Sequence, residues 1–166
     1  MIRLAISGAG AIAERAHIPA FLGVPEVAIV ALQSRTLEKA ERVAGAIAHA
    51  KKPRIYRDYD EMLRREHPDA VGIFTPNALH CEFTLKAIAA GAHVLVEKPM
   101  APTVAEARRM VDAAKAAGRV LMVAMQRRFG GLERAIKRAV HEGAIGTPHF
   151  IRSRQSHGGP EFWAPG

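Results

Sequence analysis

The sequence predicts an α/β fold built on a doubly wound parallel β-sheet, and three observations lead to this prediction. Short apolar runs alternate with stretches of helical periodicity over residues 1–125, which is the pattern of successive βαβ units. The first run ends in a glycine-rich turn, Gly8-x-Gly10-x-x-Ala13. Apolar runs at residues 2–6, 27–32, 70–74, 93–96 and 120–125, with a short strand predicted around 54–56, supply six candidate strands, which matches a complete sheet of this kind.

The glycine-rich turn leads from the first predicted strand into the first predicted helix. Glycine lets the backbone turn tightly and approach a phosphate, whose charge the N–H groups and positive dipole end of the helix can face. Ala13 stands at the last glycine position, a replacement that the pattern tolerates. The motif alone is weak evidence, because Gly- and Ala-rich turns are common. In its strand-to-helix context it predicts a Rossmann-type sheet with a site for a dinucleotide pyrophosphate.

The second predicted strand is followed by Gln33, Ser34 and Arg35, with no acidic residue. In dinucleotide-binding folds an acid at this point binds the ribose 2′-hydroxyl, whereas an arginine suits a 2′-phosphate. Lys39 falls in the first turn of a helix predicted from a Thr36 cap to about residue 50, where the helix dipole disfavours a cation. A bound phosphate would explain both cations and favours NADP over NAD. The alternative is that Arg35 and Lys39 are solvated surface charges.

The fourth predicted strand is broken by Thr75, Pro76 and Asn77 at its carboxyl end, where ligands bind in open α/β sheets. Asn77 is a suitable residue to start the next helix. His80 falls in the first turn of that helix, near the same crevice. A single histidine there fits a structural hydrogen-bonding role or a catalytic one, and the sequence leaves both open.

The fifth predicted strand delivers Glu97, Lys98 and Pro99 to the crevice. An acid and a base at the end of a buried strand are costly to place without partners, so both are candidate functional residues. Elsewhere, Asp58 and Thr103 are each followed three residues later by a glutamate, a capping-box pattern that predicts the start of a helix.

The formal net charge of +8 is unevenly distributed along the chain. Residues 1–100 hold 13 Lys and Arg against 11 Asp and Glu, whereas residues 101–166 hold 11 against 5. The basic residues of the second part recur at helical spacings opposite apolar residues, which usually marks a solvated face. No aromatic residues interleave with them as a single-strand binding platform requires. Nucleic-acid binding is therefore not expected.

The remaining composition is that of a globular protein outside the membrane. No apolar run approaches the roughly 20 residues of a membrane-spanning helix, and the first residues lack the pattern of a secretory signal peptide. The single cysteine, Cys81, has no partner for an intrachain disulfide, which agrees with a reducing compartment. A cytoplasmic location is the expectation.

These residues resemble the family of glucose-fructose oxidoreductase, inositol dehydrogenase and MocA, the Gfo/Idh/MocA group of nicotinamide-dependent oxidoreductases, from residue 2 to about residue 151. The resemblance rests on residues 8–13, Ser34 and Arg35 with Lys39, residues 75–80, and above all residues 90–99, Ala-Gly-Ala-His-Val-Leu-Val-Glu-Lys-Pro. The spacing between the Thr-Pro-Asn and Glu-Lys-Pro segments is the specific part. Residues 126–129 and 143–146 also fall where the family has comparable segments.

The resemblance implies cofactor contacts position by position. Gly8, Gly10, Ala11 and Ile12 would hold the pyrophosphate, and Ser34, Arg35 and Lys39 the 2′-phosphate of NADP, with NAD as the other possible cofactor. Thr75, Pro76, Asn77 and His80 would line the nicotinamide side, Glu97 would hydrogen-bond the nicotinamide ribose, and Gln126 would be a further contact. No metal is implied.

The resemblance also assigns Lys98 as the catalytic lysine. It would give a proton to the substrate oxygen, or take one from it, while a hydride moves between the substrate carbon and the nicotinamide ring. The alternative for Lys98 is a salt bridge to a neighbouring carboxylate. The implied substrate is a sugar, a polyol or a related compound.

The predicted domains are an NAD(P)-binding domain at residues 1–125 and, at 126–166, a connecting helix and the first strand, 149–155, of a truncated second α/β domain. In the family that domain supplies an Asp and a His that assist the lysine and commonly forms the oligomer interface; His157 matches no such motif. With only its beginning present, Ile145, Phe150, Phe162 and Trp163 should be exposed or covered by another copy of the chain.

The sequence therefore predicts the cofactor domain of an NAD(P)-dependent sugar or polyol dehydrogenase, incomplete for catalysis as this chain and belonging to a homo-oligomer. One alternative is a non-catalytic nucleotide-binding module that acts as a sensor or partner subunit. Another is a basic interaction protein that uses the fold without a nucleotide. Binding and turnover experiments separate these three.

Overall fold

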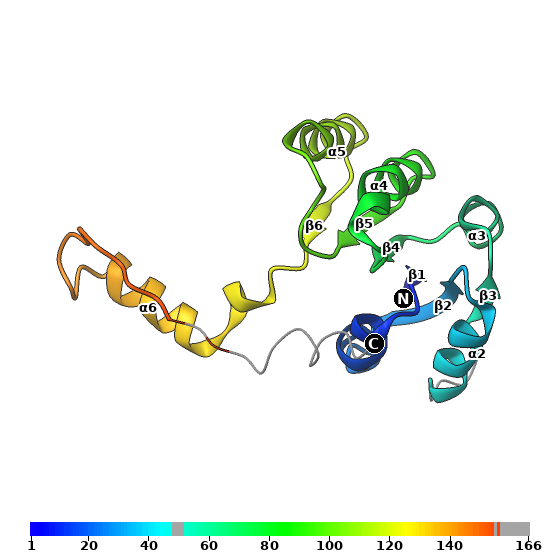
Figure 1. The fold of residues 1–166 in the computed structure, drawn as a ribbon, viewed down its shortest axis with the longest axis horizontal. Coiled ribbons are helices and arrows are strands. Elements are labelled where there is room, and N and C mark those ends of the chain that lie inside the picture. The colour runs from blue at the N-terminus through cyan, green and yellow to red at the C-terminus, as the bar shows by residue number, and fades with distance from the viewer. Residues whose placement is uncertain (48–51, 155, 157–166) are drawn as a thin grey trace. The chain divides into compact units, whose positions relative to one another are not determined.

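The computed structural model describes residues 1–47, 52–154 and 156 (Figure 1). It divides the chain into two compact units, Met1–Ala124 and Met125–Gly166. The first unit contains the whole β-sheet and the helices that cover it.

The six predicted strands are all present in the first unit and form one parallel sheet. They are β1 (Ile2–Ser7), β2 (Val27–Gln33), β3 (Arg54–Tyr56), β4 (Ala70–Ile73), β5 (His93–Val96) and β6 (Leu121–Val123). Their order across the sheet is β3-β2-β1-β4-β5-β6. The direction of strand addition reverses between β1 and β4, so the prediction of a doubly wound Rossmann-type sheet is confirmed.

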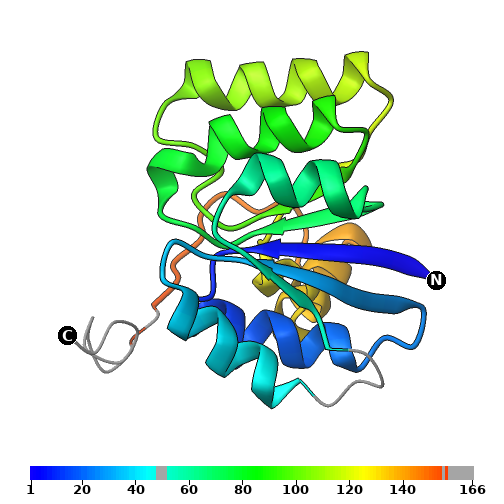
Figure 2. The same cartoon turned by 90° about the vertical axis from the view of Figure 1, so that its right-hand side faces the viewer.

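Helices cover both faces of this sheet (Figure 2). On one face lie a π-helical turn η1 (Ala13–His17), α1 (Ile18–Leu22) and α2 (Leu37–Ala46). On the other face lie α3 (Tyr59–Glu66), α4 (His80–Ala89) and α5 (Val104–Ala116), with a short 3₁₀ turn η2 (Asn77–Leu79) leading into α4. Each face has its own apolar core, so the strands are buried on both sides, as their nearly continuous apolar sequences require.

Several helix boundaries follow the predicted capping residues. The Asp58 side chain accepts a hydrogen bond from the Glu61 backbone N–H (2.6 Å), and the Thr103 hydroxyl accepts one from that of Glu106 (3.2 Å). Gly91 follows α4 with a φ of +86°, in the left-handed region where glycine carries no steric cost.

Thr36 is the N-cap residue of α2 and Asn77 begins η2, but neither side chain makes the capping hydrogen bond that was expected of it. Thr36 precedes α2, but its side chain makes no capping hydrogen bond, and its backbone N–H instead binds the Ser34 hydroxyl (3.2 Å). Asn77 begins the η2 turn and makes no side-chain cap, because the 3₁₀ turn delays the start of α4 until His80. The helix predicted to reach about residue 50 ends at Ala46, and residues 48–50 lie outside the described part of the chain.

The second unit contains a 3₁₀ turn η3 (Gln126–Phe129) and the predicted amphipathic helix α6 (Gly131–His141). The strand predicted over residues 149–155 does not form in residues 149–154, and residue 155 lies outside the described part. A strand needs a neighbouring strand for its backbone hydrogen bonds, and the described part of this unit offers none.

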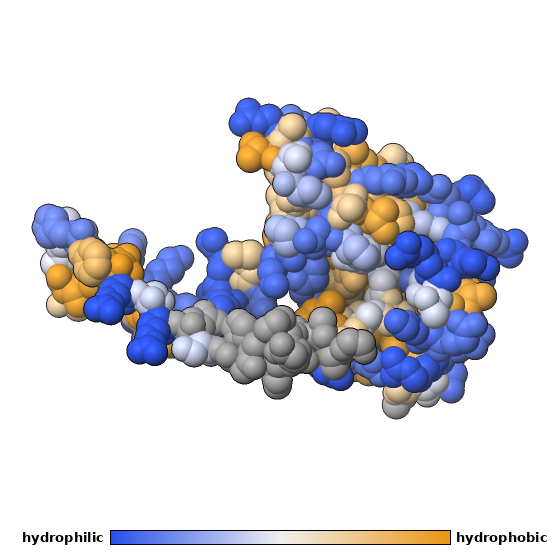
Figure 3. Space-filling view, viewed as in Figure 1, coloured by the Kyte–Doolittle hydropathy of each residue, from blue (hydrophilic) through white to orange (hydrophobic). Residues whose placement is uncertain are grey.

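Apolar side chains on the second unit are exposed, as predicted for Ile145 (61%) and Phe150 (83%). Phe162 and Trp163 lie outside the described residues. On α6 itself the exposed large apolar residues are Leu132, Ile136 and Val140, and Figure 3 shows apolar surface on this unit. None of the described helices is long and apolar enough to cross a membrane.

Candidate dinucleotide-binding site

The carboxyl ends of β1 and β4 lie side by side, because Ser7 pairs with Ile73 in the sheet. The Phe74 backbone N–H donates to the carbonyl oxygen of Ser7 (2.8 Å), and the Gly8 N–H donates to that of Gln33 (2.9 Å). The chain leaves β1 toward one face and β4 toward the other. This is the point at which open α/β sheets bind their ligands.

The two glycines of the predicted pyrophosphate loop serve different purposes. Gly8 has a φ of +98°, and a Cβ there would lie 2.5 Å from the carbonyl oxygen of Phe74, so only glycine fits against the neighbouring strand. A Cβ at Gly10 would meet nothing within 4 Å, and Gly10 is exposed. The loop thus presents open backbone, next to half-buried Ala11 and Ile12, where a pyrophosphate would approach. The residues present fit a dinucleotide.

The end of β2 has no carboxylate for a ribose hydroxyl. Gln33 is buried and committed to the fold: its Oε1 accepts from the Ser7 hydroxyl (2.6 Å), and its Nε2 donates to the carbonyl oxygen of Arg57 (2.9 Å). Arg35 and Lys39 are exposed, and their side chains make no hydrogen bond or ion pair with any residue that the structure describes. Two cations without a partner among the described residues therefore follow β2.

The Glu-Lys-Pro segment follows β5 and reaches the same edge of the sheet. Glu97 is buried, and its Oε2 accepts a hydrogen bond from the Lys98 backbone N–H (2.8 Å). The Lys98 side chain is exposed and forms no ion pair within the described residues. Lys98 therefore does not form the alternative salt bridge with any carboxylate among the described residues.

His17 is a site residue that the sequence did not indicate. It lies in η1, just after the glycine loop, and its Nε2 is 2.8 Å from Oε1 of Glu97. Its ring stacks on Phe74, with centroids 3.8 Å apart and planes 4° from parallel. The one signal in the sequence is its position four residues after Ala13, which places it about one helical turn into the segment after the glycine loop.

The Thr-Pro-Asn segment borders the crevice, with Thr75 half-buried and Pro76 and Asn77 exposed. His80 has no exposed surface. Its Nε2 lies 2.9 Å from the carbonyl oxygen of Thr75, and its Nδ1 lies 2.9 Å from that of Pro99. These two contacts favour the structural hydrogen-bonding role for His80, and its contact with the nicotinamide side stays a prediction.

An ion pair between Glu14 and Arg42 connects the segment after the glycine loop to α2. The hydrogen bond from the Arg42 guanidinium holds the pKa of the Glu14 carboxyl below its usual range.

Gln126 lies in η3 of the second unit and is exposed, so its cofactor contact stays a prediction. Within the described residues, no group of three or more His, Cys, Asp or Glu is placed to hold a metal ion.

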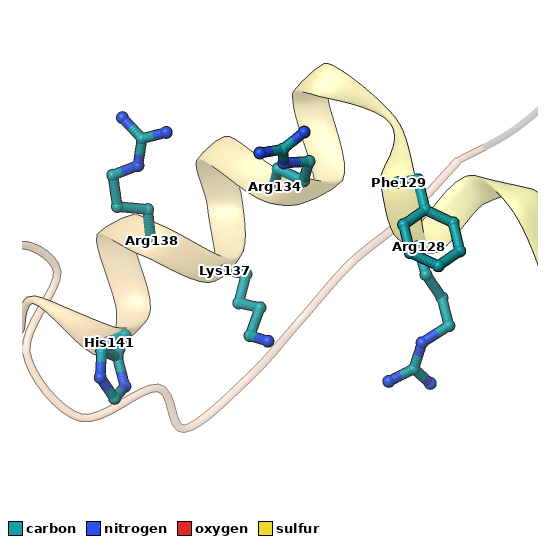
Figure 4. A pocket seen from close by; sticks show the side chains of 6 residues that line it. All are labelled: Arg128, Phe129, Arg134, Lys137, Arg138 and His141. Atoms are coloured by element: carbon teal, nitrogen blue, oxygen red, sulfur yellow. The ribbon is translucent and has the colours of Figure 1, made fainter.

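The second unit has a surface hollow of its own along η3 and α6 (Figure 4). It is lined by Arg128, Phe129, Arg134, Lys137, Arg138 and His141. These basic side chains leave the helix in different directions and do not converge on one point. The excess of positive charge in this part of the chain is therefore largely a solvated helix surface.

The family model described as "Oxidoreductase family, NAD-binding Rossmann fold" (GFO_IDH_MocA) matches residues 2–125. The chain belongs to this family. The resemblance to the Gfo/Idh/MocA group that the motifs indicated is thereby confirmed.

Named dehydrogenases match most of the chain. It is 33% identical to D-glucoside 3-dehydrogenase of Escherichia coli over 92% of this chain and 43% of that protein. It is 38% identical to the NADP⁺-dependent scyllo-inositol 2-dehydrogenase IolU of Bacillus subtilis, over 89% of this chain and 43% of that protein.

Solved structures of the family are similar in the same region. Myo-inositol 2-dehydrogenase from Lactobacillus plantarum superposes with a TM-score of 0.80 at 28% identity, over 88% of this chain and 42% of that one. The 3-ketoreductase KijD10 from Actinomadura kijaniata, in complex with NADP and TDP-benzene, gives 0.78 at 30% identity, over 87% and 43%. The chain thus spans less than half the length of each of these four proteins.

Proposed function

We propose that this chain binds NADP, in preference to NAD, as the cofactor-binding part of a dehydrogenase that acts on a sugar or polyol. The observation that carries the proposal is the end of β2: Arg35 and Lys39 are exposed and unpaired among the described residues, and the strand ends in Gln33 where an acid would bind a ribose hydroxyl. Membership of an NAD-binding oxidoreductase family supports the nucleotide. The NADP named for IolU and KijD10 supports the choice of cofactor.

Each segment of the crevice would hold a different part of the dinucleotide. The backbone of Gly10, Ala11 and Ile12 would face the pyrophosphate, with Gly8 keeping the loop against β4. Ser34, Arg35 and Lys39 would face the 2′-phosphate. Thr75, Pro76 and Asn77 would border the nicotinamide side, and Glu97 would accept hydrogen bonds from the nicotinamide ribose. Gln126 is a further contact in this proposal.

Lys98 would carry the proton transfer. Its exposed ammonium can give a proton to the oxygen of a substrate carbonyl, and the amine can take one from a hydroxyl. A bound nicotinamide would supply the hydride to the substrate carbon in the reduction, or accept it in the oxidation. The backbone of Lys98 is held by Glu97, so the lysine starts from a fixed point at the edge of the crevice.

The substrate class and the assembly belong to the same proposal. Several relatives are named for sugar or polyol substrates, including a D-glucoside and scyllo-inositol. The exposed apolar residues of the second unit support association with another copy of the chain. A small-molecule substrate and a homo-oligomer are therefore the proposed partners.

The test is calorimetric titration of the 166-residue chain with NADPH and with NADH. We expect NADPH to bind at least about tenfold more tightly, equivalent to roughly 1.4 kcal/mol. The double variant R35A/K39A should abolish the preference. R64A, which removes an exposed charge from α3 on the other face of the sheet, should leave it intact. Equal affinities in the unaltered chain would overturn the choice of NADP, and no binding would overturn the proposal.

Addition of scyllo-inositol or a D-glucoside with NADP⁺ then separates a dehydrogenase part from a nucleotide-sensing module. We expect binding without turnover from this chain, which spans 43% of the length of these two relatives. Turnover restored by adding the remaining length of a relative would support the dehydrogenase. A chain that binds the nucleotide but never supports turnover in such a fusion would favour the sensing module.

A further inference from the structure

His17 connects three segments that meet at the crevice. It belongs to η1, which follows the glycine loop; its ring stacks on Phe74 at the end of β4; and its Nε2 lies 2.8 Å from Glu97 after β5. The side chains of His17 and Glu97 are only 16% and 10% exposed. One imidazole thus joins the segment beside the pyrophosphate site to the segment that carries Lys98.

Both oxygens of the Glu97 carboxylate are held by the protein. Oε1 faces His17 Nε2, and Oε2 accepts from the Lys98 N–H (2.8 Å), while the Glu97 backbone N–H donates to the carbonyl oxygen of Ile73 (3.0 Å). A carboxylate has about four acceptor positions, so two such bonds orient it and leave the others for hydroxyl groups.

We propose that His17 is a positioning residue that orients Glu97 toward the nicotinamide ribose of a bound dinucleotide. The inference rests on the proposed function, because the hydroxyls that Glu97 would accept from belong to the cofactor. The Phe74 stack fixes the plane of the imidazole, and the N–H at Nε2 fixes the carboxylate. Without that N–H, Oε1 of Glu97 loses its partner, and only the hydrogen bond from the Lys98 backbone N–H to Oε2 still orients the carboxylate.

The competing explanation is that His17 only packs the glycine-loop segment against Phe74. Two substitutions separate the stack from the hydrogen bond. H17F retains an aromatic ring against Phe74 and removes the donor. H17Q keeps an N–H donor and removes the ring. Thermal unfolding of each variant without ligand measures how much the fold itself depends on the residue.

The experiment compares two ligands by calorimetry: NADPH, and 2′,5′-ADP, which has the adenosine half and the 2′-phosphate but no nicotinamide ribose. We expect H17F to weaken NADPH about tenfold, equivalent to roughly 1.4 kcal/mol, and to leave 2′,5′-ADP unchanged. H17Q should recover part of the NADPH affinity. In the E97Q background, H17F should cause no further loss, because His17 acts through the Glu97 carboxylate.

Three results would overturn the inference. Equal weakening of both ligands by H17F and H17Q would show a structural role. Undiminished NADPH binding by H17F would show that Glu97 needs no support. An additive loss in the double variant H17F/E97Q would show that the two residues act separately. Failure of the unaltered chain to bind either ligand would instead overturn the proposed function, and this inference with it.

Discussion

The imidazole Nδ1 of His80 lies 2.9 Å from the carbonyl oxygen of Pro99. The other ring nitrogen, Nε2, lies at the same distance from the carbonyl oxygen of Thr75. His80 thereby connects the loop after β4 with the loop after β5, the two loops that border the crevice. Carbonyl oxygens only accept, and a neutral imidazole has one N–H, so the ring donates to both only when it is doubly protonated.

Replacement of His80 by alanine should therefore destabilise the protein. The variant leaves two carbonyl oxygens without this partner and a cavity in place of the ring, and we expect a loss of about 2–4 kcal/mol in the free energy of unfolding. Urea denaturation measures it. The control is H141A, at an exposed position of α6, which should change stability by no more than about 0.5 kcal/mol. A loss for H80A as small as that of the control would refute the bridging role.

The two glycines of the phosphate loop should respond differently to alanine. In G8A the new methyl group would lie 2.5 Å from the Phe74 oxygen at a φ of +98°, and we expect a loss of about 3 kcal/mol or more. G10A adds its methyl group to open space, so the free chain should keep its stability within about 0.5 kcal/mol.

Ligand binding completes this comparison. The added methyl group of G10A would stand where the pyrophosphate is proposed to approach, so NADPH should bind more weakly than to the unaltered chain. Denaturation curves and calorimetric titration of the same preparations provide both measurements. Equal stability of G8A and G10A would contradict the close approach of the loop to β4, and unchanged affinity of G10A would contradict the proposed phosphate position.

Stability at high pH should depend on Tyr56. Its hydroxyl donates to the buried carboxylate of Glu66, which Arg3 (3.2 Å) and Arg54 (3.4 Å) also contact. Burial, and then the hydrogen bond and charge of Glu66, raise the pKa of Tyr56 above its usual value of 10.0. The folded state therefore holds the phenol proton more tightly than the unfolded state. This contribution to stability is complete below pH 10 and is lost as the pH rises above it.

The variant Y56F removes this dependence. Between pH 10 and 11 the free energy of unfolding of the unaltered chain should fall more steeply than that of Y56F, by at most about 1.4 kcal/mol per pH unit. Burial also raises the pKa of Tyr59, but that residue is common to both proteins and cancels in the comparison. Urea denaturation at several pH values measures the slopes. Parallel curves would show that Tyr56 does not titrate differently on folding.

The apolar side of α6 should promote self-association. Leu132 and Ile136, one turn apart, are 71% and 54% exposed, and exposed apolar surface of this kind favours contact with another molecule. We expect sedimentation velocity over a concentration series to show oligomers, and the variant L132E/I136E to shift the chain toward monomer. L132K/I136K is the control for charge: both variants should act alike. Unchanged association in both would place the contact elsewhere.

Local sequence patterns determined the architecture of the first unit. The alternation of apolar runs and helical periodicity predicted six strands, and all six formed one parallel sheet. Asp58 and Thr103 marked the starts of α3 and α5, because capping depends on residues within one helical turn. The glycine loop was equally local, since a strand, a tight turn and a helix follow one another directly in the chain.

The tertiary structure alone decided which side chains meet at the crevice. His17 and Glu97 are 80 residues apart in the sequence, and neither has a local pattern that points to the other. His80 was placed near the crevice correctly, but only the packing of α4 under two loops showed that it is buried. Residues 149–154 had the composition of a strand, and they formed none because strand formation depends on a hydrogen-bonding neighbour, which local sequence does not supply.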